Sequence, residues 1–254
     1  MIEKRETIRI LNLNIEYCAS ITRGYWQYLT SVWKYIIPHK INAIQAISKL
    51  INHWDADICT FVEIDGGSFR TMHMNYMKKF ANMTVLKKWH FFPVRHLLNL
   101  SNQGNGILTR YEILETHNYK LITRGENRCL SHTTIRLNNE IMHVLTTQLA
   151  LGKSSRKYEL LQIADIIKRI SGPIIFTGDL NTSNESELVA IEKAGLKRLE
   201  TPKTFPSWKP RRRIDYIFYS DDFEIVSFDV IDEMKISDHL PIIAELKLKN
   251  DKKK

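Results

Sequence analysis

The sequence lacks the features of secreted, membrane-spanning and disulfide-stabilised proteins. Its 254 residues contain three cysteines, Cys18, Cys59 and Cys129, an odd number at spacings that fit neither a zinc site nor a disulfide framework. There is no run of about 18 apolar residues, and the first residues hold no apolar stretch of signal-peptide length. We therefore expect a cytoplasmic protein with buried free thiols and no transmembrane segment.

The sequence does contain a normal apolar share and an excess of positive charge. Hydrophobic residues make up 43%, which is enough for a core, and the formal net charge is +9. Nucleic acid, phospholipid headgroups and phosphorylated small molecules would each suit this charge. Part of it lies in a basic tail at about 247–254, which we expect to be solvated. Because we find no repeat or linker, we expect one domain over residues 1–254, and a monomer.

Apolar runs of strand length alternate with helical patterns along the chain. The predicted strands cover residues 8–14, 55–64, 104–110, 172–181, 213–220 and 242–249, with the run FEIVSFDVI (223–231) between the last two. A hairpin is predicted at 131–149, turning at Asn138 and Asn139. The predicted helices cover residues 42–54, 68–82 with Ser68 as the N-cap, and 156–170. Hairpins argue against a purely parallel sheet, so we predict an α/β (α+β) sandwich of two sheets flanked by helices.

Polar residues gather at the ends of the predicted apolar strands. A carboxylate directly after a buried strand lies at the rim of a sheet, where loops build sites. One such residue is often only a turn former, whereas several in one chain indicate a site. The positions are Asn14, Glu63, Gln148, Asp179, Asn181, Asp215, Asp238 and His239.

Six motifs that contain these residues resemble, in order, those of the endonuclease/exonuclease/phosphatase superfamily. They are LNLN with Asn14, FVEID with Glu63, GNGILTR with Asn105, TGDLN with Asp179 and Asn181, RIDYIF with Asp215, and SDHLP with Asp238 and His239. Together they span residues 8 to 243. The resemblance implies a DNase I-like, four-layer sandwich of two mainly antiparallel β-sheets flanked by helices. It also implies a metal-dependent hydrolase that acts on phosphoric ester bonds.

The resemblance implies a magnesium site made of oxygen ligands. Mg²⁺ is a hard cation that prefers such ligands, with Mn²⁺ as an alternative. Glu63 is the expected principal ligand, with Asn14 and Asp238 near it. No cysteine or histidine group has zinc spacing, and His90, His96, His117, His132 and His143 are expected to be surface or structural residues.

The other motif residues receive catalytic roles from the same resemblance. Asp179 and Asn181 would orient the attacking water and the phosphate. His239 would contact a non-bridging oxygen or act as a base, with Asp215 holding the imidazole in one tautomer. Asn105 could donate a hydrogen bond to a phosphate oxygen.

One position departs from the pattern of many relatives, which carry histidine in a Thr-His-Leu motif. Here the segment is TTQL, with Gln148 at that position. An amide cannot transfer a proton as histidine does, so the general acid is left open. We expect Gln148 to point into the site and to hydrogen-bond the phosphate. The alternative is a catalytically degenerate phosphate-binding module.

Two further segments bear on the substrate. Arg128, in GENRCL, and Arg211, Arg212 and Arg213, in KPRRR, are candidate phosphate-binding residues. An aromatic insertion at about 17–38 predicts a helix packed on the sheet, a lid, or a peripheral membrane contact. Charge slightly favours nucleic acid as the substrate. A phospholipid of the sphingomyelin type and a small-molecule phosphate stay open.

Overall fold

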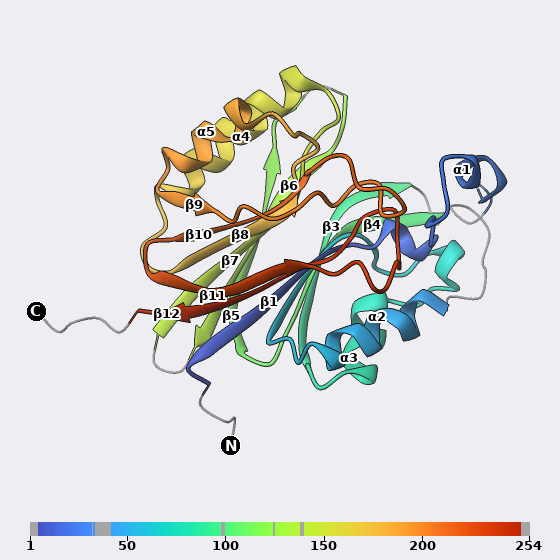
Figure 1. Cartoon of the computed structure of the whole chain (residues 1–254), viewed down its shortest axis with the longest axis horizontal. Helices are drawn as coiled ribbons and strands as arrows, with labels where there is room; N and C mark the ends of the chain where they lie inside the picture. The colour runs from blue at the N-terminus through green and yellow to red at the C-terminus, as the bar shows by residue number, and fades with distance from the viewer. Residues whose placement is uncertain are drawn as a thin grey trace, which may run out of the picture.

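The computed structural model describes residues 5–31, 33, 42–97, 100–123, 125–137 and 140–249. Within these residues the strands form two six-stranded sheets packed face to face, with helices on both outer faces (Figure 1). Sheet A contains, in order, β11 (Phe223–Val230), β12 (Ile242–Leu248), β1 (Thr7–Asn14), β2 (Ile58–Asp65), β4 (Ser101–Thr109) and β3 (Lys88–Leu97). Sheet B contains β5 (Glu112–Leu121), β6 (Arg128–Leu137), β7 (Glu140–Gln148), β8 (Ile174–Asp179), β10 (Asp215–Ser220) and β9 (Leu196–Arg198).

Both sheets are mainly antiparallel, as the resemblance implied. Strands β1 and β2 run parallel in sheet A, and β7 and β8 run parallel in sheet B. The hairpin of β6 and β7 has the predicted antiparallel pairing. Its expected turn at residues 138–139 lies outside the described residues.

Three apolar layers hold the sandwich together. Side chains alternate along each strand, so Ile10 of β1 faces the space between the sheets while Leu11 packs toward α2 (Asn42–His53). The helix α3 (Tyr76–Met83) also covers sheet A, whereas α4 (Lys153–Ile167) and α5 (Glu185–Glu192) cover sheet B. Figure 1 shows the resulting four layers and a short helix, α1 (Trp26–Ser31), that stands at the edge of the molecule.

The helix predicted over residues 68–82 is wrong in its first half. Ser68 does precede a helix, but only the 3₁₀ turn Phe69–Thr71. Met72 and His73 then adopt left-handed backbone angles, with φ of 51° and 58°, which end that turn. The α3 helix begins anew after Asn75, whose side chain accepts a hydrogen bond from the backbone of Lys78.

The aromatic insertion is only partly described, because residue 32 and residues 34–38 lie outside the described part, as do residues 250–254 of the basic tail. Its described part contains α1 and the 3₁₀ turn Glu16–Cys18. Among the described residues, no helix is long and apolar enough to cross a membrane.

Candidate active site

The register of sheet B places three predicted site residues side by side. Gln148 ends β7 and pairs with Asp179 at the end of β8, and Asp179 pairs in turn with Asp215 at the start of β10. The close approach of β8 to β7 needs glycine at position 178. Its φ is 149°, and a Cβ there would lie 1.9 Å from the carbonyl oxygen of Thr147. The Gly-Asp pair of the TGDLN motif therefore fixes where the Asp179 carboxylate lies.

Sheet A contributes Glu63 through a β-bulge. The pairing of β2 with β4 shifts register between Phe61 and Ile64, and Glu63 has a φ of 56°. A bulge redirects a side chain, and a left-handed angle in a residue other than glycine is backbone strain of the kind that gathers at functional sites. Asp65, two residues on, forms a buried ion pair of 2.6 Å with Arg70, which fixes the chain just after the bulge.

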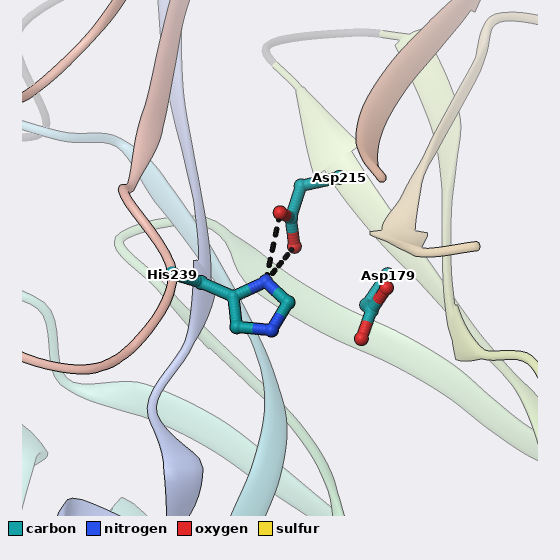
Figure 2. Close-up of side chains that lie close together, drawn as sticks. All are labelled: Asp179, Asp215 and His239. Atoms are coloured by element: carbon teal, nitrogen blue, oxygen red, sulfur yellow. Dashed lines mark hydrogen bonds and ion pairs between the residues drawn. The ribbon is translucent and has the colours of Figure 1, made fainter. Parts of the chain in front are cut away.

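A histidine and an aspartate from the two sheets meet at the site, within the predicted hydrogen-bond reach of each other. His239 Nδ1 lies 2.8 Å from Asp215 Oδ2, and both side chains are buried (Figure 2). The Thr204 hydroxyl donates a second hydrogen bond, of 2.5 Å, to Asp215 Oδ2. The ring of Phe205 packs 4.8 Å from the imidazole, centroid to centroid. His239 is therefore held in one orientation, with its Nε2 turned toward Asp179.

Asp179 is the centre of a hydrogen-bond network. Its Oδ1 accepts from the backbone N–H of Asn181 at 3.0 Å, and its Oδ2 lies 3.2 Å from Asn14 Nδ2. The amide of Asn181 donates to the carbonyl oxygen of Leu149 at 2.8 Å, so Asn181 braces the turn that holds Asp179. Asn14 Oδ1 accepts from the backbone of Glu16 at 3.1 Å. Both asparagines thus support Asp179.

Gln148 lies inside the site and connects its two sides. Its Nε2 donates to Glu63 Oε1 at 2.5 Å and lies 3.4 Å from Asp179 Oδ2. Its Oε1 accepts from Arg128 at 2.7 Å, and Arg128 also pairs with Glu126. The Arg128 Nε is buried and has no hydrogen-bond partner among the described residues.

A cavity of about 520 Å³ opens over these groups. The predicted site residues that line it are Glu63, Asn105, Arg128, Gln148, Asp179, Asn181, Arg212, Asp238 and His239. Asn14 and Asp215 lie behind this lining and contact Asp179 and His239. Asn105 is buried and donates to the Ser131 hydroxyl at 3.1 Å.

The arginines of the KPRRR segment separate. Arg212 lines the cavity, whereas Arg211 is exposed outside it. The phosphate-binding role predicted for Arg213 does not fit. Its guanidinium lies 2.6 Å from both Glu185 and Glu200, outside the cavity lining.

Four residues of the site were missed by the sequence analysis. Arg95, Tyr17 and Phe205 line the cavity, and the hydroxyl of Tyr28 donates to Asp238. Tyr17 and Tyr28 belong to the aromatic insertion, but no motif assigned a site role to any of the four, because their positions depend on how distant segments pack.

The buried carboxylates repel one another and lose hydration. Burial, aided by the charge of Asp238, raises the pKa of Glu63, and burial likewise raises the pKa of Asp179 and of Asp238. Burial alone would lower the pKa of His239, but the charges of Asp215 and Asp238 raise it well above its usual value. The site therefore contains an excess of acidic oxygens that a cation would stabilise.

The residues present fit a divalent cation. Glu63 and Asp238 supply carboxylate oxygens, the ligand type that Mg²⁺ prefers. The Oδ1 of Asp238 is buried and has no hydrogen-bond partner among the described residues. An unpaired buried carboxylate oxygen is costly, and a bound cation would remove that cost. Asp179, Asp215 and His239 also offer ligand atoms within 4.8 Å of one another, but the contact between Asp215 and His239 already engages one atom of each. We therefore favour the carboxylate set.

Comparison with known proteins identifies the family. A sequence model described as the Endonuclease/Exonuclease/phosphatase family matches residues 37–239, and the chain belongs to that family. Its members are hydrolases of phosphoester bonds and generally depend on a divalent metal. A search of curated proteins gave no significant match.

Solved structures share the fold at low sequence identity. An endonuclease/exonuclease/phosphatase from Beutenbergia cavernae has a TM-score of 0.75 and 18% identity, covering 97% of this chain and 72% of that one. A mannosyl-6-phosphatase from Bacteroides thetaiotaomicron has a TM-score of 0.69 and 16% identity, covering 94% and 99%. The TDP2 of D. rerio, complexed with a single-strand DNA product, has a TM-score of 0.72 and 17% identity, covering 96% and 100%.

Proposed function

We propose that this protein is a Mg²⁺-dependent phosphodiesterase that hydrolyses its substrate by in-line attack of water. The observation that carries the proposal is the convergence of Glu63, Asp179, Asp238 and the paired His239 on one cavity that arginines also line. Carboxylates can accept the proton of the attacking water and can bind the cation, whereas arginines can bind phosphate oxygens. Mn²⁺ is the alternative cation.

The chain's own groups have distinct tasks in this reaction. Asp179, with its raised pKa, accepts the proton of the attacking water as the new P–O bond forms. His239 donates a hydrogen bond from Nε2 to a non-bridging oxygen, where charge develops. Its Nδ1 stays protonated because it donates a hydrogen bond to the Asp215 carboxylate. The P–O bond to the leaving group then breaks. The leaving oxygen takes its proton from water, because the amide of Gln148 can donate a hydrogen bond but cannot transfer a proton.

The cation, when bound by Glu63 and Asp238, would neutralise charge on the phosphoryl group and the leaving oxygen. Arg128 and Arg212 would bind phosphate oxygens. The unpaired Nε of Arg128 and its position in the cavity lining support this role. Gln148 would hold Glu63, Asp179 and Arg128 in their relative positions.

Nucleic acid is the favoured substrate class. Three arginines line the cavity: Arg95, Arg128 and Arg212. Arg211, next to Arg212 in the sequence, is exposed. Several positive charges suit a backbone with successive phosphates. The complex of D. rerio TDP2 with a single-strand DNA product supports this choice for the fold. A cytoplasmic location is consistent with the buried free thiols of Cys18, Cys59 and Cys129.

A phospholipid diester is the second candidate, because α1 and the residue before it expose apolar side chains. Tyr25, Trp26 and Leu29 are 62%, 58% and 82% exposed. A panel of single- and double-stranded DNA, RNA, nucleotides, phosphoinositides and sphingomyelin vesicles, run with Mg²⁺ and with EDTA, separates the two. We expect Mg²⁺-dependent cleavage of a nucleic acid. Cleavage of vesicle lipid alone would contradict that preference, and no cleavage of any substrate would contradict the enzymatic proposal.

A further inference from the structure

The α1 segment reaches the predicted metal site through one side chain. Tyr28, the third residue of α1, donates its hydroxyl hydrogen to Asp238 Oδ2, although the two residues are 210 positions apart in sequence. Asp238 is buried, and Tyr28 is partly exposed. The aromatic insertion therefore contacts Asp238, which belongs to the SDHLP motif and lines the active-site cavity.

The ring of Tyr28 is held in this position by a small aromatic cluster, consisting of Tyr25, Tyr28 and Trp208. Tyr25 contacts Trp208 edge-on at 5.2 Å between ring centroids, and Tyr28 lies 6.5 Å from each of the other two rings. Trp208 is itself anchored to the loop that contains Asp238. The backbone N–H of the preceding Ser207 donates to the carbonyl oxygen of Asp238 at 2.7 Å.

The hydrogen bond from Tyr28 makes the two oxygens of Asp238 unequal. Oδ2 accepts from Tyr28, whereas Oδ1 is buried with no hydrogen-bond partner among the described residues. His239 Nε2 lies 4.0 Å from Oδ1, beyond hydrogen-bond distance. A buried carboxylate oxygen without a partner is expensive unless a cation or another donor satisfies it.

We propose that Tyr28 is a positioning residue of the metal site, which holds Asp238 by Oδ2 so that Oδ1 alone binds the divalent cation. The proposal rests on the metal-dependent activity proposed above. Partners of this kind orient ligand side chains and change metal affinity without touching the metal. In this protein the partner comes from the insertion between β1 and α2, so α1 belongs to the metal site as well as to the surface.

Metal affinity measured without substrate tests the proposal. Mn²⁺ is the probe, because its binding can be followed by electron paramagnetic resonance as well as by calorimetry. Tyr28→Phe keeps the ring and its contacts but removes the hydroxyl, and it should raise the Kd for Mn²⁺ by about 10- to 100-fold. The unfolding temperature of the metal-free protein, measured alongside, shows that the variant is folded. Tyr25→Phe is the matched control from the same aromatic cluster, and its Kd should equal that of the wild type.

The outcomes separate this inference from the proposed function. A Tyr28→Phe protein that binds Mn²⁺ as tightly as the wild type would overturn it, whatever its unfolding temperature. An equal loss of affinity in Tyr25→Phe would also overturn it, because that loss would come from the cluster and not from the hydroxyl. If the wild type binds no Mn²⁺, the inference fails together with the metal site. If Mn²⁺ binds and the Tyr28 effect is present but no phosphodiester is cleaved, only the proposed function fails.

Discussion

His239 and Asp215 meet across the space between the two sheets, with 2.8 Å between Nδ1 and Oδ2. Asp215 begins β10 of sheet B, while His239 lies just before β12 of sheet A. The contact directs the remaining ring nitrogen of His239 toward Asp179 (Figure 2). The geometry of the dyad therefore depends on how the sheets pack, and its chemistry depends on which nitrogen carries the proton.

Replacing Asp215 with asparagine should damage catalysis more than folding. An amide can present its nitrogen to Nδ1 and favour the wrong tautomer, so His239 would no longer offer a proton from Nε2. We expect kcat to fall by about 10²–10⁴-fold with a smaller change in KM. Steady-state kinetics on bis-p-nitrophenyl phosphate, with circular dichroism as the folding control, measure this. A folded Asp215→Asn protein with wild-type kcat would rule out the dyad.

Much of the scaffold could be predicted because local sequence determines it. Asp179 at the end of one apolar strand and Asp215 at the start of another were predicted to lie at the sheet rim, and the order of the motifs predicted the fold. Three strands, β3, β5 and β9, escaped detection, and β9 has only three residues. β5 is a polar edge strand that is mostly exposed, and β3 is an edge strand that contains Pro93, so neither shows clear alternation.

Details of the site could not be predicted because they depend on distant packing. The bulge that redirects Glu63 arises from the pairing of β2 with β4. Arg213 forms ion pairs with Glu185 and Glu200 and therefore lies outside the cavity lining. These glutamates lie 28 and 13 positions before it in the sequence, and no motif contains them. The contact of Tyr28 with Asp238 joins an insertion to the last motif.

Replacing Glu63 with glutamine should weaken the response to metal. The charge lost is one that the cation would neutralise, and Gln148 Nε2 would no longer face a carboxylate. We expect the Mg²⁺ concentration for half-maximal activity to rise, and kcat/KM to fall by about a hundredfold or more. The measurement is a Mg²⁺ titration of hydrolysis at fixed substrate. An unchanged titration curve would remove Glu63 from the metal site.

Replacing Gln148 with alanine should be milder than replacing Asp179 with alanine. Gln148 contributes hydrogen bonds to charged groups, worth about 1.5–3 kcal/mol, or roughly a ten- to hundredfold loss in rate. Asp179→Ala also removes the base, so its loss should be larger. Parallel kcat/KM measurements on one phosphodiester compare the two. A Gln148→Ala enzyme as inactive as Asp179→Ala would contradict the bridging role.

A histidine cluster predicts how stability depends on pH. His132, which is buried, lies 2.9 Å from His143, Nε2 to Nδ1, and its ring lies near His117. Burial, with the positive charges of His143 and His117, lowers the pKa of His132 to about 4. The unfolded chain therefore binds more protons than the folded chain between about pH 6.5 and pH 4. Stability should be full above this window and fall as the pH drops through it.

Urea unfolding at pH 7.5 and pH 5 measures this dependence. His132→Gln can still donate to His143 but does not titrate, so its loss of stability between the two pH values should be smaller than in the wild type. His53→Gln is the control, because His53 ends α2, which packs on sheet A, whereas His132 and His143 lie on β6 and β7 of sheet B. Equal losses in His132→Gln and the wild type would show that His132 does not carry the effect.

The most direct test of the central claim is the initial rate of bis-p-nitrophenyl phosphate hydrolysis by the wild type and by Asp179→Asn, each with Mg²⁺ and with EDTA. The account predicts release of p-nitrophenol by the wild type with Mg²⁺, its loss with EDTA and its recovery when Mg²⁺ is restored. It also predicts a rate at least about a hundredfold lower in a folded Asp179→Asn protein. Hydrolysis that is insensitive to EDTA, or equal in the two proteins, would contradict a metal-dependent phosphodiesterase site at Asp179.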